Sequence, residues 1–419
     1  MESLKNSSTL AKNAALIAGP LLGLLAGAGL VATGSTAEIG WTVGVTVLVA
    51  LWWIFEPLPI AVTSLIPVAV FPLVGVLDSS EVGQAYGDKL ILLMLGGFML
   101  SKAMERSGAH RRIALLMVRL FGGSGGPRLI YGFMAASAFL SMWISNAATT
   151  LMLLPIALAV VERAEDSRLA TGLLLGIAYA ASIGGIATPI GTPPNLVFMQ
   201  VYEANTGMEP SFLQWMGWAL PITFVMIPIA GWWLTRGMPK DHEITLPTVG
   251  AWRAEEVRTL LVLAATALLW ITRKEPGGGW STWLGLPSAN DASIALLAVV
   301  ALFIVPNGRG ERLMTWESAV KIPWGLLLLF AGGISIARAF IASGLSQSLG
   351  EALSQLGSLP LLALTLSLCL AVTFLTEITS NTATTTLLMP ILAAAAIAAG
   401  IDPKQIMIPA ALSASFAFM

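Results

Sequence analysis

SNAATTLMLLPIALAVVERA, at residues 145–164, returns at residues 380–399 as SNTATTTLLMPILAAAAIAA. Ten of these twenty positions are identical, at an offset of 235 residues. A second pair of segments, LLMLGGFMLSKAMERSG at 92–108 and LLFAGGISIARAFIASG at 328–344, matches at seven of seventeen positions with an offset of 236. Two matched blocks in the same order and at nearly the same offset indicate an internal duplication.

The composition around these blocks is typical of a membrane protein. Of the 419 residues, 56% are hydrophobic and 11% are charged, and the mean hydropathy is +0.82. A soluble domain has about 25% charged residues and could not bury so much apolar surface. The net charge of -1 provides no basic field for nucleic acid. The single cysteine, Cys369, excludes an intramolecular disulfide framework and a cysteine-cluster metal site.

We therefore predict an all-α polytopic membrane protein, with the first apolar run a transmembrane helix because it is longer than the core of a signal peptide. Spans are predicted near 14–33, 41–55, 58–77, 90–105, 212–235, 257–272, 290–305, 322–341 and 359–375, with longer apolar stretches at 129–160, 169–201 and 383–419.

The positive charges predict that the two repeats have opposite orientations. Six Lys and Arg residues lie between 102 and 128, whereas the matching stretch 338–364 contains only Arg338. Because cytoplasmic loops are enriched in Lys and Arg, the first block ends inside and its copy ends outside. Lys5 and Lys12 place the N-terminus in the cytoplasm by the same rule. Arg273–Lys274 is an exception, since the scheme places this pair outside.

The same charges predict two re-entrant hairpins. The stretch 129–160 lies between two cytoplasmic basic clusters, so it enters and leaves on one side, with Ser145-Asn146 near its tip. By the repeat, 359–399 enters from outside, with Ser380-Asn381 at its tip. The segment SIGGIATPIGTPPN at 182–195 breaks a helix, which hydrocarbon tolerates only inside protein or beside a cavity. We expect the tips to meet near the bilayer midplane.

The repeat divides the chain into four parts. Residues 1–89 are scaffold helices, 90–210 the first inverted repeat and transport domain (tip at 145–147, broken helix at 188–195), 211–320 scaffold and connecting helices, and 321–419 the second inverted repeat (tip at 380–382). The step of 49 residues from Asn146 to Asn195, taken from Asn381, reaches about residue 430. We therefore expect residues 1–419 to be most of a longer chain, cut inside its last repeat element.

The tips carry residues suited to ions. Ser and Asn are N-cap residues, and a helix N-terminus with free N–H groups attracts anions. Hydroxyl, amide and carbonyl oxygens also suit Na⁺. A single Ser-Asn tip could equally be a helix cap or a contact between helices. Two copies in inverted arrangement, beside TPIGTPPN, favour a binding site.

The segment WWIFEPLPIAVTSLIPVAVFPLVGVL at 52–77, the two Ser-Asn tips and GTPPN at 191–195 resemble the divalent anion/sodium symporter family, over essentially the whole chain. The resemblance implies a homodimer with scaffold and transport domains and an elevator-type movement. It also implies import of C4-dicarboxylate, citrate or sulfate coupled to Na⁺, without an organic cofactor.

The resemblance further implies the residues of three sites. One Na⁺ site would use Ser141, Ser145, Asn146 and Gly191, and the second Thr376, Thr379 and Asn381. The substrate would contact Asn146, Ala147, Thr192, Pro193, Asn381 and Thr382. The family pattern at each tip is Ser-Asn-Thr. The second tip fits this pattern, whereas the first has Ala147 in place of Thr.

We therefore expect a Na⁺-coupled transporter of a small dianion such as succinate or malate, in the inner (plasma) membrane, with no nucleic-acid partner. Citrate and sulfate remain alternatives, as does an exchanger or H⁺-coupled carrier on the same fold, which Glu377 would motivate. An intramembrane enzyme would need catalytic His, Asp or Cys at membrane depth. His110 and His242 are both expected in polar loops, so we expect no enzyme.

Overall fold

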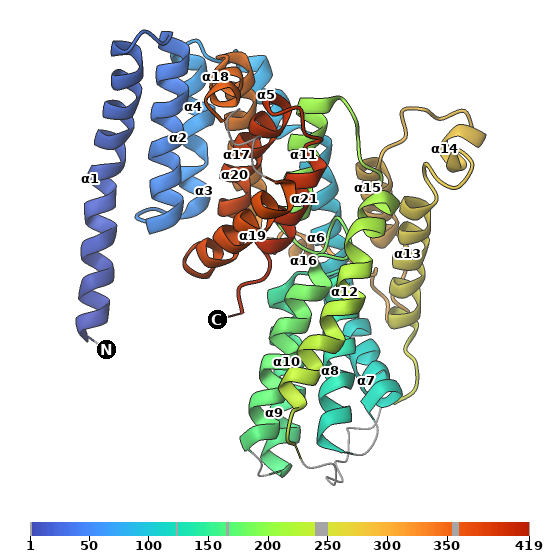
Figure 1. Ribbon diagram of the computed structural model, residues 1–419. Coiled ribbons are helices and arrows are strands. Elements are labelled where there is room, and N and C mark those ends of the chain that lie inside the picture. The colour runs from blue at the N-terminus through green and yellow to red at the C-terminus, as the bar shows by residue number, and fades with distance from the viewer. Residues whose placement is uncertain (1, 123–124, 165–166, 239–249, 354–359, 419) are drawn as a thin grey trace.

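The computed structural model describes residues 2–122, 125–164, 167–238, 250–353 and 360–418. These residues form helices and turns, with one isolated bridge between Pro306 and Arg312 (Figure 1). The helices are α1 (Glu2–Ala32), α2 (Ala37–Phe55), α3 (Ile60–Thr63), α4 (Leu65–Leu73), α5 (Ser79–Tyr86), α6 (Lys89–Ser107), α7 (Ala109–Gly122), α8 (Gly126–Ser141), α9 (Asn146–Ala164), α10 (Ser167–Gly185), α11 (Pro193–Thr206), α12 (Phe212–Thr235), α13 (Ala254–Ile271), α14 (Gly279–Trp283), α15 (Asp291–Ile304), α16 (Trp316–Ala319), α17 (Trp324–Ala342), α18 (Leu345–Leu353), α19 (Leu361–Ile378), α20 (Asn381–Ala398) and α21 (Lys404–Ser413).

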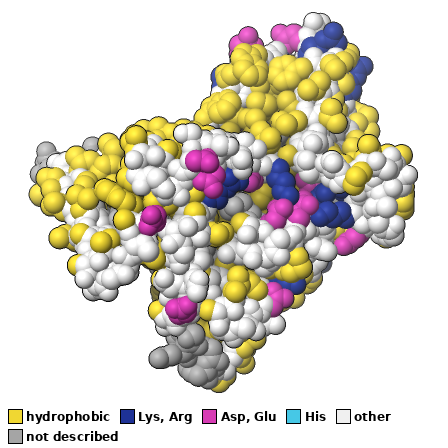
Figure 2. All heavy atoms as spheres, turned by 90° about the horizontal axis from the view of Figure 1, so that it is seen from above, with side chains coloured by type: hydrophobic (Ala, Val, Ile, Leu, Met, Phe, Trp, Pro, Cys, Tyr) yellow, Lys and Arg dark blue, Asp and Glu magenta, His cyan; other side chains and the backbone are white. Residues whose placement is uncertain are grey.

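Seven helices in the described part of the chain are long and apolar enough to cross a membrane. They are α2, α10, α12, α17, α19, α20 and the segment Leu10–Ala32 of α1. Hydrophobic side chains cover large areas of the face in Figure 2, and charged side chains gather there in groups of mixed sign. The prediction of an all-α, multi-span membrane protein is confirmed.

The predicted span at 58–77 is a shorter apolar segment, Ile60–Leu73, with a break at one residue. It forms two short helices, α3 and α4, which meet at Ser64. Pro67 has no N–H for the carbonyl of Thr63, but prolines also lie inside continuous helices, such as Pro155 in α9 and Pro390 in α20, so this loss does not by itself explain the break. The Ser64 hydroxyl donates to the Ile60 carbonyl oxygen at 2.7 Å and accepts from Trp53 Nε1 at 3.1 Å. The break is therefore stabilised by local bonds.

The prediction that His110 lies in a polar loop is wrong. His110 lies in α7 rather than in a polar loop. Its Nδ1 is 2.8 Å from the carbonyl oxygen of Met104, so this half-buried ring closes the junction between α6 and α7. His242 lies outside the described residues.

Three pairs of helices contain the breaks that matter for the site. α8 and α9 are joined through residues 142–145, and α19 and α20 through 379–380. α10 and α11 are joined through 186–192, where Pro193 and Pro194 open the second helix. Proline suits the first turn of a helix because the missing N–H has no partner there in any case. Each pair presents a helix start inside the protein.

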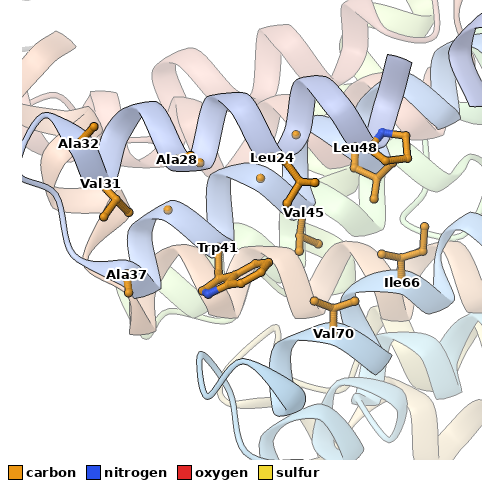
Figure 3. A pocket seen from close by; sticks show the side chains of 15 residues that line it. Leu24, Ala28, Val31, Ala32, Ala37, Trp41, Val45, Leu48, Ile66 and Val70 are labelled. Atoms are coloured by element: carbon orange, nitrogen blue, oxygen red, sulfur yellow. The ribbon is translucent and has the colours of Figure 1, made fainter. Parts of the chain in front are cut away.

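At one edge of the molecule, α1 packs closely on α2 through glycines. A Cβ on Gly23 would lie 2.5 Å from the Gly44 carbonyl oxygen, and one on Gly27 would lie 2.4 Å from that of Gly40. Small residues permit such close helix contacts in membranes. Beside this contact α1, α2 and α4 enclose a cavity of about 700 Å³ (Figure 3). Its lining is apolar, with Leu24 among the side chains.

An ionic cluster joins the ends of four elements. Arg273, which is 3% exposed, lies 2.6 Å from Asp291 and 3.0 Å from Glu209. Lys274 pairs with Glu209 at 2.9 Å, and Lys89 pairs with Glu203 at 2.6 Å. Burial by itself raises the pKa of Glu209, but the hydrogen bond from Lys274 and the neighbouring cations lower it below the ordinary value. The cations at 273–274 are thus neutralised by acids.

Candidate functional site: a cavity between the two hairpins

Both hairpin tips and the GTPPN segment line one cavity of about 260 Å³. The sequence-predicted residues that line it are Ser145, Asn146, Ala147, Gly191, Thr192, Pro193, Asn381 and Thr382. Asn146 and Asn381 are 235 residues apart in the chain, so only the tertiary fold brings them to one place. The remainder of the wall comes from α6, α17 and neighbouring residues, including Met94, Gly97, Phe98, Trp143 and Leu326.

Around the first tip, three residues of the predicted first Na⁺ site lie together. The Ser141 hydroxyl donates to Asn146 Oδ1 at 2.7 Å. A Cβ on Gly191 would lie 2.8 Å from the Ser141 carbonyl oxygen and 2.4 Å from that of Gly185. A Cβ on Gly185 would in turn lie 2.4 Å from Asn146 Oδ1. Ser141, Asn146, Gly185 and Gly191 therefore form one close group of oxygen-bearing residues.

The second tip is arranged differently. Asn381 Oδ1 accepts hydrogen bonds from the Thr382 backbone N–H at 2.7 Å and from its hydroxyl at 3.1 Å. Thr379 Oγ1 lies 2.6 Å from Thr384 Oγ1. The Thr376 hydroxyl donates to the Ala414 carbonyl oxygen at 2.9 Å, at the end of α21. Asn381 thus lies in the cavity wall, whereas Thr376 and Thr379 are not among the described residues that line it.

Three helices begin at the cavity. α9 begins at Asn146, α11 at Pro193 and α20 at Asn381, and all three residues are in its wall. The Ser145 hydroxyl accepts from the Ala148 N–H at 3.3 Å, which satisfies one N–H of the first turn. Each helix N-terminus carries roughly half a positive charge. None of the described lining residues is Lys, Arg or His, so the positive potential in this wall comes from the helix ends: from free N–H groups at α9 and α20, and from the dipole alone at α11, which opens with two prolines.

Sequence reasoning missed the contribution of α6. Gly97 lines the cavity, and a Cβ there would meet only Ile190, at 3.8 Å. Gly96 instead packs on Ala295, which would lie 2.5 Å from its Cβ. The duplicated Gly-Gly block was the available signal, since it repeats at Gly332-Gly333. Its two glycines serve different purposes, one in helix packing and one in leaving room at the cavity.

Asn195, the last residue of GTPPN, was also missed. It is fully buried, and its side-chain amide contacts the break between α10 and α11. The available signal was its position directly after Pro193-Pro194, at the start of a helix. The carbonyl groups at the end of the preceding helix need hydrogen-bond partners, and an Asn at this position can donate to them.

The larger cavity between α1, α2 and α4 offers no comparable chemistry. Its wall consists of glycine, alanine, proline and larger apolar side chains such as Trp41 and Ile66 (Figure 3). A dianion in such a site would lose its hydration without gaining hydrogen bonds. The cavity at the hairpin tips is therefore the candidate binding site.

Comparison with known proteins agrees with the fold. The citrate transporter family model matches residues 50–414. The sodium-dependent dicarboxylate transporter SdcS of Staphylococcus saprophyticus is 38% identical over 405 residues, covering 90% of this chain and 77% of the relative. SdcS of Staphylococcus aureus (strain USA300) is 38% identical over 436 residues, covering 96% and 82%.

Among solved structures, the YdaH transporter of Alcanivorax borkumensis is similar in fold. The TM-score is 0.56 at 16% sequence identity, over 84% of this chain and 77% of that chain. The family model spans most of the chain, and the relatives are transporters rather than enzymes. The chain therefore belongs to the citrate transporter family, as a multi-span transporter of the divalent anion/sodium symporter type.

Proposed function

We propose that this protein uses the Na⁺ gradient to import a small divalent anion, a C4-dicarboxylate such as succinate or malate, across the plasma membrane. The observation that carries the proposal is the single cavity lined by both Ser-Asn tips and by Gly191-Thr192-Pro193. The names of the relatives, which are sodium-dependent dicarboxylate transporters, support both the cation and the substrate class.

The wall of the cavity fits a small dianion. Its volume, about 260 Å³, is just below the ~300–1,000 Å³ of pockets for drug-sized ligands. The helix starts at Asn146 and Asn381 provide N–H groups for carboxylate oxygens. The first two residues of α11, Pro193 and Pro194, have no N–H, so this helix contributes only the positive end of its dipole. The hydroxyl of Thr382 and the residues Ala147 and Thr192 complete the proposed contacts. Without a cationic side chain among the described lining residues, bound Na⁺ would supply the remaining positive charge.

For the first Na⁺ site we propose Ser141, Ser145, Asn146 and Gly191. Its ligands are hydroxyl, amide and carbonyl oxygens, the donor types that hard cations prefer. The contacts among Ser141, Asn146 and Gly191 support this assignment, because all three already lie around Gly185. A cation here would also lie at the N-terminal end of α9, next to the proposed substrate contacts.

For the second Na⁺ site we propose Thr376, Thr379 and Asn381. The bond from Thr376 to the Ala414 carbonyl oxygen brings the end of α21 to the second hairpin. At the repeat offset of 235, Ala414 corresponds to Tyr179 in α10, so the bond joins the second hairpin to the counterpart of that helix. The ligands are again oxygen atoms of side chains and backbone.

We further propose an elevator-type movement in a homodimer, with the N-terminus in the cytoplasm. The hairpins and the broken helices α10–α11 would carry the cavity, while α6 and α17, which the division by repeats placed with the hairpins, would instead belong to the stationary part. The lining supports this division, since Met94, Gly97 and Leu326 of α6 and α17 face the tips across the cavity. Movement of the tips past these residues would open the cavity to alternate sides.

The test is uptake of labelled succinate, citrate and sulfate into proteoliposomes with an imposed Na⁺ gradient. We expect succinate to accumulate, unlabelled malate to compete with it, and replacement of Na⁺ by choline to stop accumulation. If none of the three accumulates, the symport proposal is wrong. Accumulation that persists in choline and requires internal dicarboxylate would show an exchanger, and accumulation that follows a pH gradient would show an H⁺-coupled carrier.

A further inference from the structure

The side chain of Asn195 spans the break between α10 and α11. Its Nδ2 donates to the carbonyl oxygens of Thr188 at 2.7 Å and Gly185 at 3.0 Å, and lies 3.4 Å from that of Ile186. Trp215 Nε1 donates to the Ile186 oxygen at 2.8 Å. The end of a helix leaves carbonyls without intrahelical partners, and hydrocarbon cannot supply any. Asn195 and Trp215 therefore provide the bonds that keep this break in one shape.

The break that Asn195 holds is also the wall of the proposed first Na⁺ site. Gly185, whose carbonyl oxygen accepts from Asn195, is the residue around which Ser141, Asn146 and Gly191 lie. The spacing is tight, because any Cβ at Gly185 or Gly191 would overlap a neighbouring oxygen. A small shift of the Gly185 peptide would therefore change the separation of the proposed ligand oxygens.

One atom of Asn195 is unusual. The side chain is 0% exposed, and its Oδ1 has no hydrogen-bond partner among the described residues. Buried polar atoms nearly always have a partner, and one without is costly to keep. The three donated contacts fix which side-chain atom is nitrogen, so the unpartnered atom is the oxygen. An apolar side chain at this position would bury no unpartnered oxygen. The amide has the advantage that its N–H groups donate to the carbonyl oxygens of the break.

We propose that Asn195 is a positioning residue for Na⁺ coupling. Its amide holds the Gly185 and Thr188 carbonyls so that the oxygens of the first Na⁺ site have the spacing that the cation requires. It acts through these carbonyls and is not among the described residues that line the cavity. The inference rests on the proposed Na⁺ coupling and deepens it.

The test compares Asn195→Leu, which is similar in size but has no donor, with Asn205→Leu on the same helix. Asn205 is a suitable control because its amide also donates to one carbonyl, that of Val201 at 2.8 Å, away from the break. In proteoliposomes, Asn195→Leu is expected to raise the Na⁺ concentration for half-maximal succinate uptake about tenfold. The KM for succinate at saturating Na⁺ stays within about threefold of wild type, and Asn205→Leu changes neither value.

A second measurement covers loss of transport or of folding. Addition of NaCl in place of KCl raises the Tm of purified wild-type protein if Na⁺ binds the folded state. Asn195→Leu should lose most of this shift, and Asn195→Ser, which retains a hydroxyl donor, should recover part of it. If Asn195→Leu does not purify, the Na⁺-dependent Tm shift of Asn195→Ser decides whether the inference holds: a shift smaller than that of the wild type supports it. Wild-type Na⁺ dependence in the purified variants, by uptake and by Tm, would overturn the inference.

These readouts separate the inference from the proposed function. A wild-type protein that responds to Na⁺, with variants that respond equally, contradicts only the role of Asn195. A wild-type protein that transports succinate with no response to Na⁺, and whose Tm is the same in NaCl and KCl, contradicts the proposed coupling itself. The Tm measurement needs no substrate, so it remains informative if succinate is the wrong dianion.

Discussion

The Ser141 hydroxyl donates a 2.7 Å hydrogen bond to Asn146 Oδ1, across the turn between α8 and α9. The equivalent residues of the second repeat bond elsewhere: Thr376 to the Ala414 carbonyl oxygen and Asn381 to Thr382. The duplication therefore preserved the residue types at both tips but not their contacts. We expect the two proposed Na⁺ sites to differ in affinity for this reason.

The paired asparagines give the most direct prediction. Asn146→Ala and Asn381→Ala each remove an amide oxygen from the cavity wall, and each is expected to reduce succinate uptake to background. Both variants should still purify as folded protein, because neither side chain fills the hydrophobic core. Asn205→Ala is the control, since its amide bonds to Val201 outside the cavity. Uptake at the wild-type rate in either tip variant would contradict the site.

Ala147 offers a gain-of-contact test. It lies in the cavity wall at the position where the second tip has Thr382. Ala147→Thr adds a hydroxyl that can bond to a carboxylate, and we expect the KM for succinate to fall about three- to tenfold. Thr382→Ala removes the matching hydroxyl and should raise the KM by a similar factor. Equal KM values for all three proteins would show that these positions do not contact the substrate.

Gly191→Ala tests the close packing of the first tip. The added Cβ would overlap the backbone oxygens of Gly185 and Ser141, which are not free to rotate away. We expect a loss of about 1–3 kcal/mol of stability and a weaker response to Na⁺. Gly217→Ala, in α12, is the control, because its Cβ meets nothing within 4 Å. Helix propensity predicts that this control gains about 0.5–1 kcal/mol. Thermal unfolding in detergent measures both effects.

In the ionic cluster around Arg273, we expect the stability losses from replacing Arg273 and Asp291 to be non-additive. Arg273 and Asp291 have side chains only 4% and 7% exposed, so Arg273→Met leaves a buried carboxylate without its main partner. The expected loss is about 3–5 kcal/mol. Replacing both residues, with Arg273→Met and Asp291→Leu, should restore much of it. Losses that simply add in the double variant would show that the two side chains do not stabilise one another.

Glu209 predicts how stability changes with pH. Its pKa in the folded protein is lowered from the ordinary value of 4.5, so its contribution is full above that value and is lost as the pH falls through the folded pKa. Glu209→Gln should therefore lower the Tm at pH 7 and reduce the further loss between pH 5 and pH 3. Glu105→Gln, which breaks an exposed pair with Lys102, should have a smaller effect at pH 7. An unchanged pH dependence in Glu209→Gln would contradict this account.

Much of the fold was accessible from the sequence because its signals are local. Composition determined the membrane class. Pro193-Pro194 determined that a helix starts there, because proline suits the first turn of a helix and not its interior. The span predicted at 58–77 is the shorter apolar helix Ile60–Leu73, with a turn at Ser64 that depends on a contact with Trp53 and so was not visible in the local pattern. His110 was misplaced because its neighbours are polar, although its ring packs against the end of α6.

The sequence alone thus determined the duplication, the helical class and the breaks at Ser145, Gly191 and Ser380, because each depends on neighbouring residues and on the demand for backbone hydrogen bonds. Only the tertiary structure decided that three helix starts share one cavity, that Asn195 bonds back to Gly185, and that Thr376 bonds to Ala414. Those contacts depend on how helices pack in three dimensions, and the same local pattern is compatible with many packings. The two repeats demonstrate this, since nearly identical tips make different hydrogen bonds.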